Sequence, residues 1–305
     1  MSKNNNNTYR KRKNWTKKNQ KKEEEVVKEE KKKQKILRRK KRQKEREELG
    51  EKAPPKLVQI TQEMTRLPDL TTVVPNDPEV LFSEKTDEMS EYFDKKKKPK
   101  ICFTTTGNTK VRSPDLIKDL IQCFGNSTFF ARRNYKIPEI VEYCNNRKYT
   151  DIMIISECNK KINGLIHIHL PIGPTAHYKL SSVVTRSQMK HVPKKFVQYR
   201  PELIFKNFST RLGHTVTRML NSLMPHNPQY KGRRLLVFHN QRDFVFFRHY
   251  RYKFESKEKT SLSEIGPQFT LKLRTVQLGT WDTNHGEYIW YYRSKMGSSR
   301  LKWFL

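Results

Sequence analysis

Apolar and polar residues alternate with a period of two in the stretch EIGPQFTLKLRTVQLG, residues 264–279. The apolar side contains Phe269, Leu271 and Leu273, and the polar side contains Gln268, Thr270, Lys272 and Arg274. This pattern predicts a β-strand with one buried face and one solvent face. Lys272 and Arg274 stand two positions apart, roughly 6.5 Å along a strand, which suits two contacts to a phosphate chain. Alternatively, the charges keep an edge strand from pairing with another molecule.

Similar apolar runs predict further strands on both sides of the chain's middle. They are ICFTTT (101–106), STFFAR (127–132), DIMIIS (151–156), GLIHIHLP (164–171), ELIFKNF (202–208), RLLVFH (234–239), DFVFFRHYRYKF (243–254) and GEYIWYYR (286–293). Apolar residues at helical spacing predict helices that begin at Ser113, near Pro138 and after a cap at Ser209. Strands that alternate with helices predict a mixed α/β fold. A strand, a helix and a hairpin follow one another twice, so we expect two related halves.

Composition divides the chain into four segments. They are a basic helical or disordered arm (1–50), a proline-rich acidic linker (51–99), a folded domain (100–290, in halves of about 100–190 and 200–290) and a basic C-terminal tail (291–305). In the arm, residues 21–49 have the pattern of a solvated helix, and residues 1–19 that of a disordered segment. In the linker, residues 69–94 carry eight acidic residues and one basic residue. This segment either lies across a basic surface, of this protein or of a partner, or is only solvated.

Charge narrows the possible partners. The 305 residues include 64 Lys or Arg and 31 Asp or Glu, a formal net charge of +33. The first 50 residues contribute 21 − 8 = +13, and the remainder contributes +20. An excess in both parts predicts salt-dependent binding to a polyanion, with RNA or DNA favoured over a membrane surface. The sequence has no run of 18 apolar residues and no apolar signal region, so we expect a protein of the cytosol or nucleus with no membrane partner.

Motifs of enzyme chemistry are missing from the sequence. TTTGNTK at 104–110 lacks the second glycine and the GK[ST] ending that a phosphate-cradling loop needs. His167 and His169 alternate onto one strand face without a third ligand at metal spacing. The four cysteines include no close pair. We therefore expect a protein that is not an enzyme, with no catalytic residue, no metal and no cofactor.

Basic residues that alternate with aromatic rings indicate a binding function instead. Arg248 and Arg251 stand among Phe246, Phe247, Tyr250 and Tyr252 in one predicted strand. On the polar face of the helix after Ser209, a second basic set consists of Arg211, His214 and Arg218. Cations beside stacking surfaces are typical of proteins that hold RNA, although several of these rings must belong to the core.

Long motifs in the chain resemble Brix-domain proteins and, within that family, the ribosome production factor branch that assembles the large ribosomal subunit. The matching stretches are LPIGPTAHYKLSSV (170–183), NFSTRLGHTVTRML (207–220), PHNPQYKGRRLLVFHNQRDFVFFRHYRYKF (225–254) and EIGPQFTLKLR (264–274). The resemblance extends over about residues 54–305. The acidic linker, including VVPNDPEV at 73–80, is similar to the large-subunit branch rather than to its small-subunit relatives.

The resemblance implies a two-halved α/β fold similar to the anticodon-binding domains of synthetases, a nucleolar location and binding to precursor ribosomal RNA. The implied protein partners are other large-subunit assembly factors and ribosomal proteins in precursor particles of that subunit. The family's RNA-binding segment matches about 257–275, which gives as candidates Lys257, Lys259, Gln268, Thr270, Lys272, Arg274 and Thr275. Gln268 stands where the family pattern has a basic residue, which weakens one expected phosphate contact.

The combined expectation is a non-enzymatic RNA-binding factor needed for assembly of the large ribosomal subunit and maturation of its precursor RNA. Two alternatives remain open. One is the same fold in assembly of the small subunit. The other is a nucleolar protein-binding adaptor whose charge only retains it there.

Overall fold

The computed structural model describes residues 29–41, 43–45, 48, 59–61, 63–74, 76–107, 113–190, 192, 199–256, 259–282, 285–298 and 302–305. The chain forms two compact units, Met1–Ile60 and Thr61–Leu305. In the first unit, residues 29–41 are α-helical and exposed; residues 1–28 lie outside the described residues. Within the described residues, no helix is long and apolar enough to cross a bilayer.

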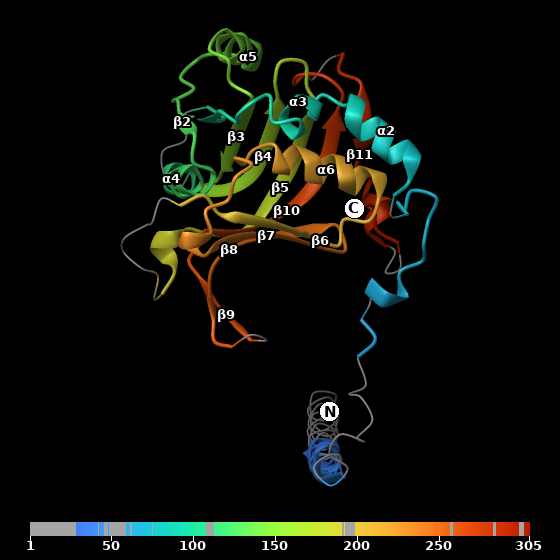
Figure 1. Cartoon of the computed structure of the whole chain (residues 1–305). Coiled ribbons are helices and arrows are strands. Elements are labelled where there is room, and N and C mark those ends of the chain that lie inside the picture. The colour runs from blue at the N-terminus through green and yellow to red at the C-terminus, as the bar shows by residue number, and fades with distance from the viewer. Residues whose placement is uncertain are drawn as a thin grey trace, which may run out of the picture. The chain divides into compact units, whose positions relative to one another are not determined.

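Strands and helices alternate over residues 101–158 and again over 202–241 in the second unit, and each alternating stretch is followed by consecutive strands (Figure 1). The strands are β1 (Ile101–Thr105), β2 (Ser127–Phe129), β3 (Asp151–Cys158), β4 (Lys161–His169), β5 (Thr175–Val184), β6 (Glu202–Lys206), β7 (Arg234–Gln241), β8 (Phe244–Phe254), β9 (Thr260–Glu264), β10 (Gln268–Gln277) and β11 (Tyr288–Tyr291). The α-helices are α2 (Pro78–Thr86), α3 (Ser90–Phe93), α4 (Ser113–Phe124), α5 (Ile137–Asn146) and α6 (Arg211–Asn221). Short 3₁₀ turns are η2 (Glu63–Thr65), η3 (Arg186–Gln188), η4 (Tyr230–Gly232) and η5 (Ser294–Ser298).

The strands join into one sheet with two related halves. The order is β2-β1-β3-β4-β5-β10-β8-β7-β6, with β11 paired to β10 and β9 paired to β8. In the first half, β1 is parallel to β3, and β3, β4 and β5 follow as antiparallel neighbours. In the second half, β6 is parallel to β7, and β7, β8 and β10 follow as antiparallel neighbours. The antiparallel pair of β5 and β10 joins the halves, which confirms the predicted mixed α/β fold.

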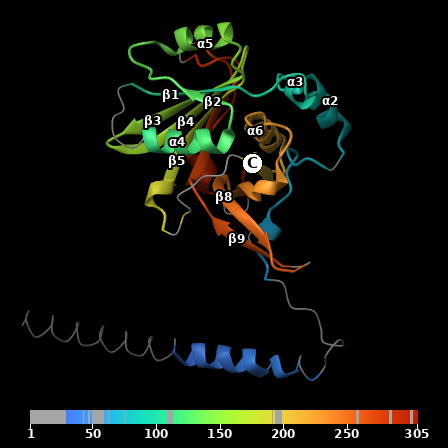
Figure 2. The same ribbon diagram turned by 60° about the vertical axis from the view of Figure 1, so that its left-hand side comes forward.

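Apolar side chains pack on both faces of this sheet, on one of them only over its first half. Figure 2 shows β1, β3 and β4 between α5 and α4. The larger core cluster joins α4 and α6 to the sheet and includes a row of rings, Phe205, Phe238, Phe247 and Phe269, with neighbouring centroids 5.1, 5.0 and 4.4 Å apart. The smaller cluster packs Val141 and Cys144 of α5 against Ile152, Ile154 and Ile166. Burial of such side chains is the main favourable term in folding.

The predicted strand at 268–274 is β10, and its register follows the prediction. Phe269, Leu271 and Leu273 are each at most 3% exposed, whereas Lys272 and Arg274 are half-buried. β10 pairs with β5 on one side and β8 on the other. The alternative reading, that its charges guard a sheet edge, is therefore wrong, because this strand lies inside the sheet.

Four elements differ from the sequence-based expectation. β5 and β9 were not predicted, and α2 and α3 lie within the segment expected to be a linker. The start of α2 has a clear local signal, because the Asp77 side chain accepts a hydrogen bond from the Glu79 N–H and Pro78 occupies the first helical position. The helix after Ser209 is capped by Thr210, whose Oγ1 accepts from the Gly213 N–H at 2.9 Å.

The last described residues pack into the domain. Trp303 is 8% exposed and Leu305 is 1% exposed, although the sequence assigned both to a basic tail. The N–H groups of Phe304 and Leu305 donate to Asp243 Oδ1 at 2.6 and 2.9 Å, so the β7–β8 turn holds this segment. The segment is buried at this end because its last three residues, WFL, are apolar, whereas the basic residues that led to its assignment as a tail precede them.

Candidate nucleic-acid interface

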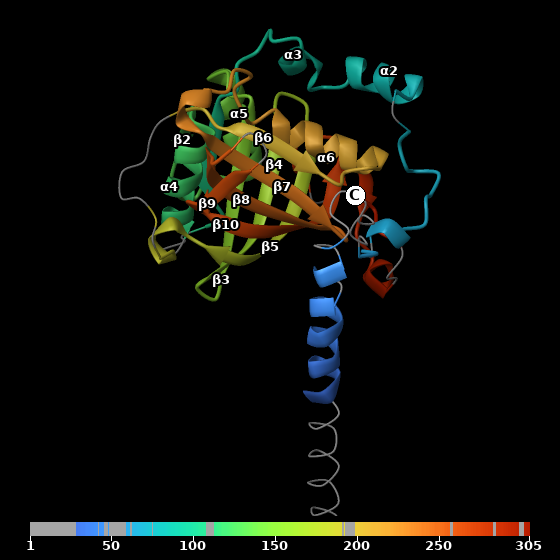
Figure 3. The ribbon, with the colours of Figure 1, turned by 60° about the horizontal axis from the view of Figure 1, so that its bottom comes forward.

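A basic and aromatic surface lies on one face of β5, β10 and β8. We call it the open sheet face and define it by Lys179, Phe244, Phe246, Arg248, Lys272 and Arg274. Lys272 shares a face with Lys179 and Phe244 because direct cross-strand partners project to the same side. Phe246 and Arg248 follow Phe244 at a spacing of two and so project to that side as well. Arg274 lies where the β10–β5 register shifts, and its contact with the Tyr292 ring, which Lys272 also contacts, places it on this face. This is the face that α5 covers over the first half of the sheet, and Figure 3 shows β5, β10 and β8 side by side.

Two lysines stand directly opposite each other on this face. Lys272 of β10 pairs with Lys179 of β5, and on its other side it pairs with Phe244 of β8. Like charges in directly opposite positions destabilise a sheet. A bound anion relieves this repulsion, so the pair is suited to hold a phosphate chain.

Aromatic rings fix the cations of the open sheet face. The Lys272 Nζ lies 4.6 Å from the Phe244 ring centroid and 4.5 Å from that of Tyr292, and it donates a hydrogen bond to Tyr292 Oη at 3.3 Å. The Arg274 guanidinium lies 4.9 Å from the same Tyr292 ring. Each cation therefore has a defined position but keeps donors for an external acceptor, because an ammonium has three N–H groups and a guanidinium has five.

Arg248 makes more contacts within the protein than Lys272 and Arg274 do. Its guanidinium lies 5.8 Å from the Phe246 ring centroid, forms an ion pair with Glu264 at 3.5 Å and donates to the Phe247 carbonyl at 2.8 Å. Arg251 stands three residues away on the regular strand β8, and it therefore projects from the opposite face. The structure separates these two arginines, which the sequence had grouped.

Several other candidates contribute less to the open sheet face than expected. Thr270 was expected on the solvent face but is 5% exposed, because its cross-strand neighbours Phe246 and Ser181 flank its short side chain. Gln268 and Thr275 are half-buried. The other two candidates, Lys257 and Lys259, precede β10. The Lys259 Nζ forms an ion pair with Glu255 at 2.6 Å, and Lys257 lies outside the described residues.

The basic stripe of α6 is occupied by the acidic segment. Arg211 donates to Glu79 Oε1 at 3.0 Å, His214 Nδ1 lies 3.0 Å from Glu84 Oε1, and Arg218 donates to Asp87 Oδ1 at 2.7 Å. Figure 1 shows α2 alongside α6. The stripe expected to face RNA therefore faces α2 and its C-cap, with Glu79 and Glu84 on the helix and Asp87 directly after it. Of the interpretations left open for this segment, the structure shows it across a basic surface of its own chain.

A buried histidine positions the start of β10. The His249 Nδ1–H donates to the Gly266 carbonyl at 2.7 Å, and the Arg234 Nε–H donates to His249 Nε2 at 3.1 Å. Burial and the adjacent Arg234 charge lower the pKa of His249 to about 3, so its ring is neutral at physiological pH. Gly266 has φ of +67°, and a Cβ there would lie 2.4 Å from the Met189 sulfur, so glycine is required at this turn.

The two histidines of β4 bind a carboxylate. His167 Nε2 and His169 Nδ1 lie 3.0 and 2.8 Å from Oδ1 of Asp151, which is fully buried at the start of β3. Among the described residues, no group of three His, Cys, Asp or Glu side chains is arranged to hold a metal ion. These histidines therefore serve to join β3 to β4.

Two members of the open sheet face, Lys179 and Phe244, were not among the predicted residues, and neither was the neighbouring Tyr292. Lys179 was missed because β5 was not recognised as a strand. Its sequence, TAHYKLSSVV, carries the signal, since Ala176, Tyr178 and Leu180 alternate with polar residues and are buried. Tyr292 was placed in the final aromatic strand, but only the fold brings its ring to Lys272.

Known proteins resemble this chain in sequence. The Brix domain profile matches residues 106–275. The chain is 48% identical to "Ribosome production factor 1" of Pongo abelii over 262 residues, which cover 86% of this chain and 75% of that protein. It is 40% identical to "Ribosome production factor 1" of Saccharomyces cerevisiae over 264 residues, 86% of each chain.

A solved structure described as a probable ribosomal biogenesis protein from Aeropyrum pernix aligns with 57% of this chain and 96% of its own, at 13% identity and a TM-score of 0.42. The profile match covers more than half of the chain, and the identities of 40–48% extend over most of its length. This chain belongs to the Brix domain family.

Proposed function

We propose that this protein is a ribosome assembly factor that binds precursor ribosomal RNA through the open sheet face and catalyses no reaction. The observation that carries the proposal is the direct opposition of Lys179 and Lys272, flanked by Phe244 and Tyr292. Phosphates neutralise such cations, and rings beside them stack on bases. The relatives named ribosome production factor 1 support the assignment to ribosome assembly.

The finer assignment is to assembly of the large subunit and maturation of its precursor RNA, in the nucleolus. Its partners are the precursor RNA and the other assembly factors and ribosomal proteins of large-subunit precursor particles. The acidic, proline-containing segment before the domain supports this choice, since the sequence resembles the large-subunit branch there. The net charge of +33 supports an RNA partner, because neutralised phosphates release counterions and so favour association.

The test is a salt titration of RNA affinity with the double variant Lys179→Ala/Lys272→Ala. Loss of two phosphate contacts should reduce the slope of log affinity against log salt by about two and weaken binding at every salt concentration. The matched control is Lys118→Ala/Lys160→Ala, which removes the same charge from exposed positions on α4 and in the β3–β4 turn. This control should leave the slope nearly unchanged.

Crosslinking followed by sequencing of the bound RNA decides between the possible roles. Enrichment of large-subunit precursor sequences, lost in the double variant, is the expected result. Enrichment of small-subunit precursor sequences would move the protein to the other branch. Absence of any direct RNA crosslink in the domain, with protein contacts retained, would instead indicate a protein-binding adaptor.

A further inference from the structure

We propose that a pocket between β1, the loop 130–136 and α5 receives one unstacked base of single-stranded RNA. The pocket has a volume of about 560 Å³, within the usual range of ligand sites, roughly 300–1,000 Å³. This inference rests on the proposed function, because it concerns RNA that already contacts the open sheet face. It adds a base-binding site to a surface that otherwise contacts the phosphate chain.

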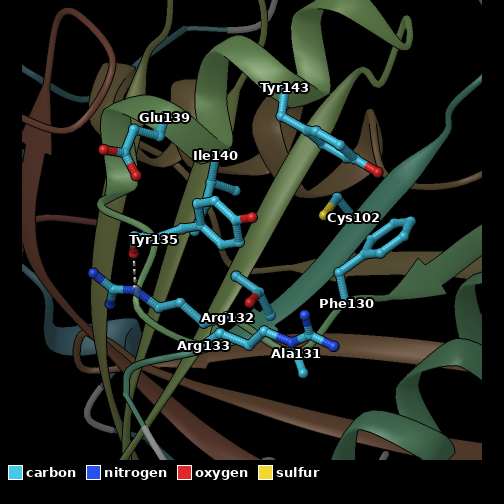
Figure 4. A pocket seen from close by; sticks show the side chains of 10 residues that line it. Cys102, Phe130, Ala131, Arg132, Arg133, Tyr135, Glu139, Ile140 and Tyr143 are labelled. Carbon is cyan, nitrogen blue, oxygen red and sulfur yellow. Dashed lines mark hydrogen bonds between the residues drawn. The ribbon is translucent and has the colours of Figure 1, made fainter.

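Aromatic rings form one side of the pocket. Phe130 and Tyr143 are 38% and 39% exposed, and their ring centroids lie 5.9 Å apart at an interplanar angle of 72°. The Arg147 guanidinium lies 3.6 Å from the Tyr143 ring centroid and holds that ring. Figure 4 shows Tyr143, Phe130 and Cys102 grouped together, with Tyr135 facing them. Exposed rings of this kind offer the flat apolar faces on which bases stack.

The charged groups of the pocket favour a nucleotide over a bare anion. The Arg132 Nε–H donates to the Tyr135 carbonyl at 3.0 Å, which fixes the loop, while the exposed Arg133 lines the pocket and adds a second cation (Figure 4). Glu139 also lines the pocket, and its Oε2 accepts from the Lys136 N–H at 2.9 Å. A carboxylate repels a phosphate that enters the pocket, but it accepts hydrogen bonds from the exocyclic amine of a base.

The hydroxyl of Thr104 is an independent indication that the pocket binds a ligand. Thr104 lines the pocket, is 1% exposed, and its Oγ1 has no hydrogen-bond partner among the residues that the structure describes. A buried hydroxyl without a partner is costly, and nearly all such groups are paired in folded proteins. Less than 1 Å² of this oxygen is accessible, so a base that stacks on the rings pairs with it once the Thr104 side chain turns to another rotamer and presents Oγ1 to the pocket.

The pocket opens on the same side of the sheet as the open sheet face. Thr104 pairs with Ile154, Ile154 pairs with Ile166, and Ile166 pairs with His177. Direct partners share a face, and Lys179 stands two residues beyond His177 on β5, so it shares that face too. One strand of RNA can therefore contact the lysine pair and place a base in the pocket on a single side of the molecule.

The test uses the full chain and a single-stranded RNA of mixed sequence, with an otherwise identical RNA in which one internal base is removed. Three variants are compared: Tyr143→Leu removes the stacking ring, Tyr143→Phe keeps it, and Thr104→Val removes only the hydroxyl. We expect Tyr143→Leu to weaken binding of the intact RNA about tenfold and to abolish its advantage over the abasic RNA. Tyr143→Phe should bind as the wild type does.

Thr104→Val separates a binding role from a structural one. Since the hydroxyl has no partner in the protein, its removal should leave the melting temperature unchanged or raise it, while RNA binding weakens several-fold. If Tyr143→Leu and Thr104→Val bind intact RNA as well as the wild type does, the pocket does not hold a base. The proposed function would then still stand on Lys179 and Lys272. Absence of any RNA binding by the wild type would overturn both proposals.

Discussion

Asp151 lies at the start of β3 with its side chain fully buried between His167 and His169. Burial alone would raise the pKa of Asp151, but the charge of His169 and the hydrogen bonds from both histidines lower it below its ordinary value. Burial likewise acts to lower the pKa of His169, and the adjacent Asp151 outweighs it and raises that pKa. The pair therefore stabilises the fold only while both groups are charged.

Replacing Asp151 with Asn should lower the free energy of unfolding by about 3–5 kcal/mol near pH 6, because a charged His169 remains buried without its partner. The difference from wild type should shrink as the pH falls below about 4, where Asp151 of the unfolded chain takes up a proton, and should be lost fully only below the lowered pKa of the folded state. It should also shrink as the pH rises above about 6.5 and through the raised pKa of His169, where that ring becomes neutral.

Chemical denaturation of the wild type and Asp151→Asn from pH 3 to pH 9 measures this effect. Glu142→Gln on α5 is the matched control, since Glu142 is exposed and should change stability little at any pH. A difference between wild type and Asp151→Asn that stays constant over the whole range would show that the loss is one of packing and not of charge.

Neighbouring residues of β10 should respond in opposite ways to substitution. Leu273→Ala should cost about 2–5 kcal/mol of stability, because it removes a core side chain and leaves a cavity. Lys272→Ala should cost about 1 kcal/mol or less, from the lost ring contacts, and yet weaken RNA binding. Denaturation and RNA affinity measured in one buffer compare the two. An unstable Lys272→Ala with full RNA affinity would make this strand purely structural.

At the scale of elements, the most consequential contact is that of α2 with α6. Two arginine–carboxylate ion pairs and the His214–Glu84 contact turn a stripe with the composition of an RNA-binding surface into an internal interface. Arg218 is the most enclosed of the three stripe residues, with a side chain 13% exposed and its guanidinium 4.0 Å from the Phe93 ring centroid. The acidic segment is therefore part of the folded unit and contributes to its stability.

Arg218→Ala should lower stability by about 2 kcal/mol, because it leaves the partly buried Asp87 carboxylate without its charged donor. Arg211→Ala serves as a comparison, since the Arg211–Glu79 pair is exposed and should contribute little. Urea denaturation of both variants tests this ranking. Equal and small losses would mean that α2 is only loosely held by α6.

At the scale of the whole molecule, positive charge is present both in the first 50 residues and in the rest of the chain. The first 50 residues carry +13 and few aliphatic residues, and the described part of them, residues 29–41, 43–45 and 48, is exposed. The remaining residues carry +20, with the open sheet face among their basic surfaces. A long basic arm adds electrostatic attraction to RNA without a core of its own.

Deletion of residues 1–50 should therefore leave the melting temperature of the domain nearly unchanged but reduce RNA affinity and nucleolar accumulation. Calorimetry and RNA titration of the shortened chain, beside the full chain, check both parts. A substantial fall in the melting temperature would show that the arm packs against the domain, and would move the domain boundary toward the N-terminus.

Periodic patterns along the chain predicted much of this fold. The alternation at 268–274 correctly placed Phe269, Leu271 and Leu273 in the core, since a strand's side-chain period is local and strict. The helices at 113–124 and 211–221 were likewise found from spacing near 3.6 residues. β5 was missed although its residues alternate, and with it the partner that makes β10 an interior strand.

The amino-acid sequence by itself determined the α/β class, the two halves, the basic character and the membership of a family, because these depend on local periodicity, composition and long motifs. Only the tertiary structure decided which cations remain available to a partner. Arg211, His214 and Arg218 are matched by acidic residues about 130 positions earlier, and Arg248 and Arg251 are divided between two faces. Lys179 meets Lys272 across more than 90 residues, and sequence spacing carries no information about such pairs, since they are set by strand order and register.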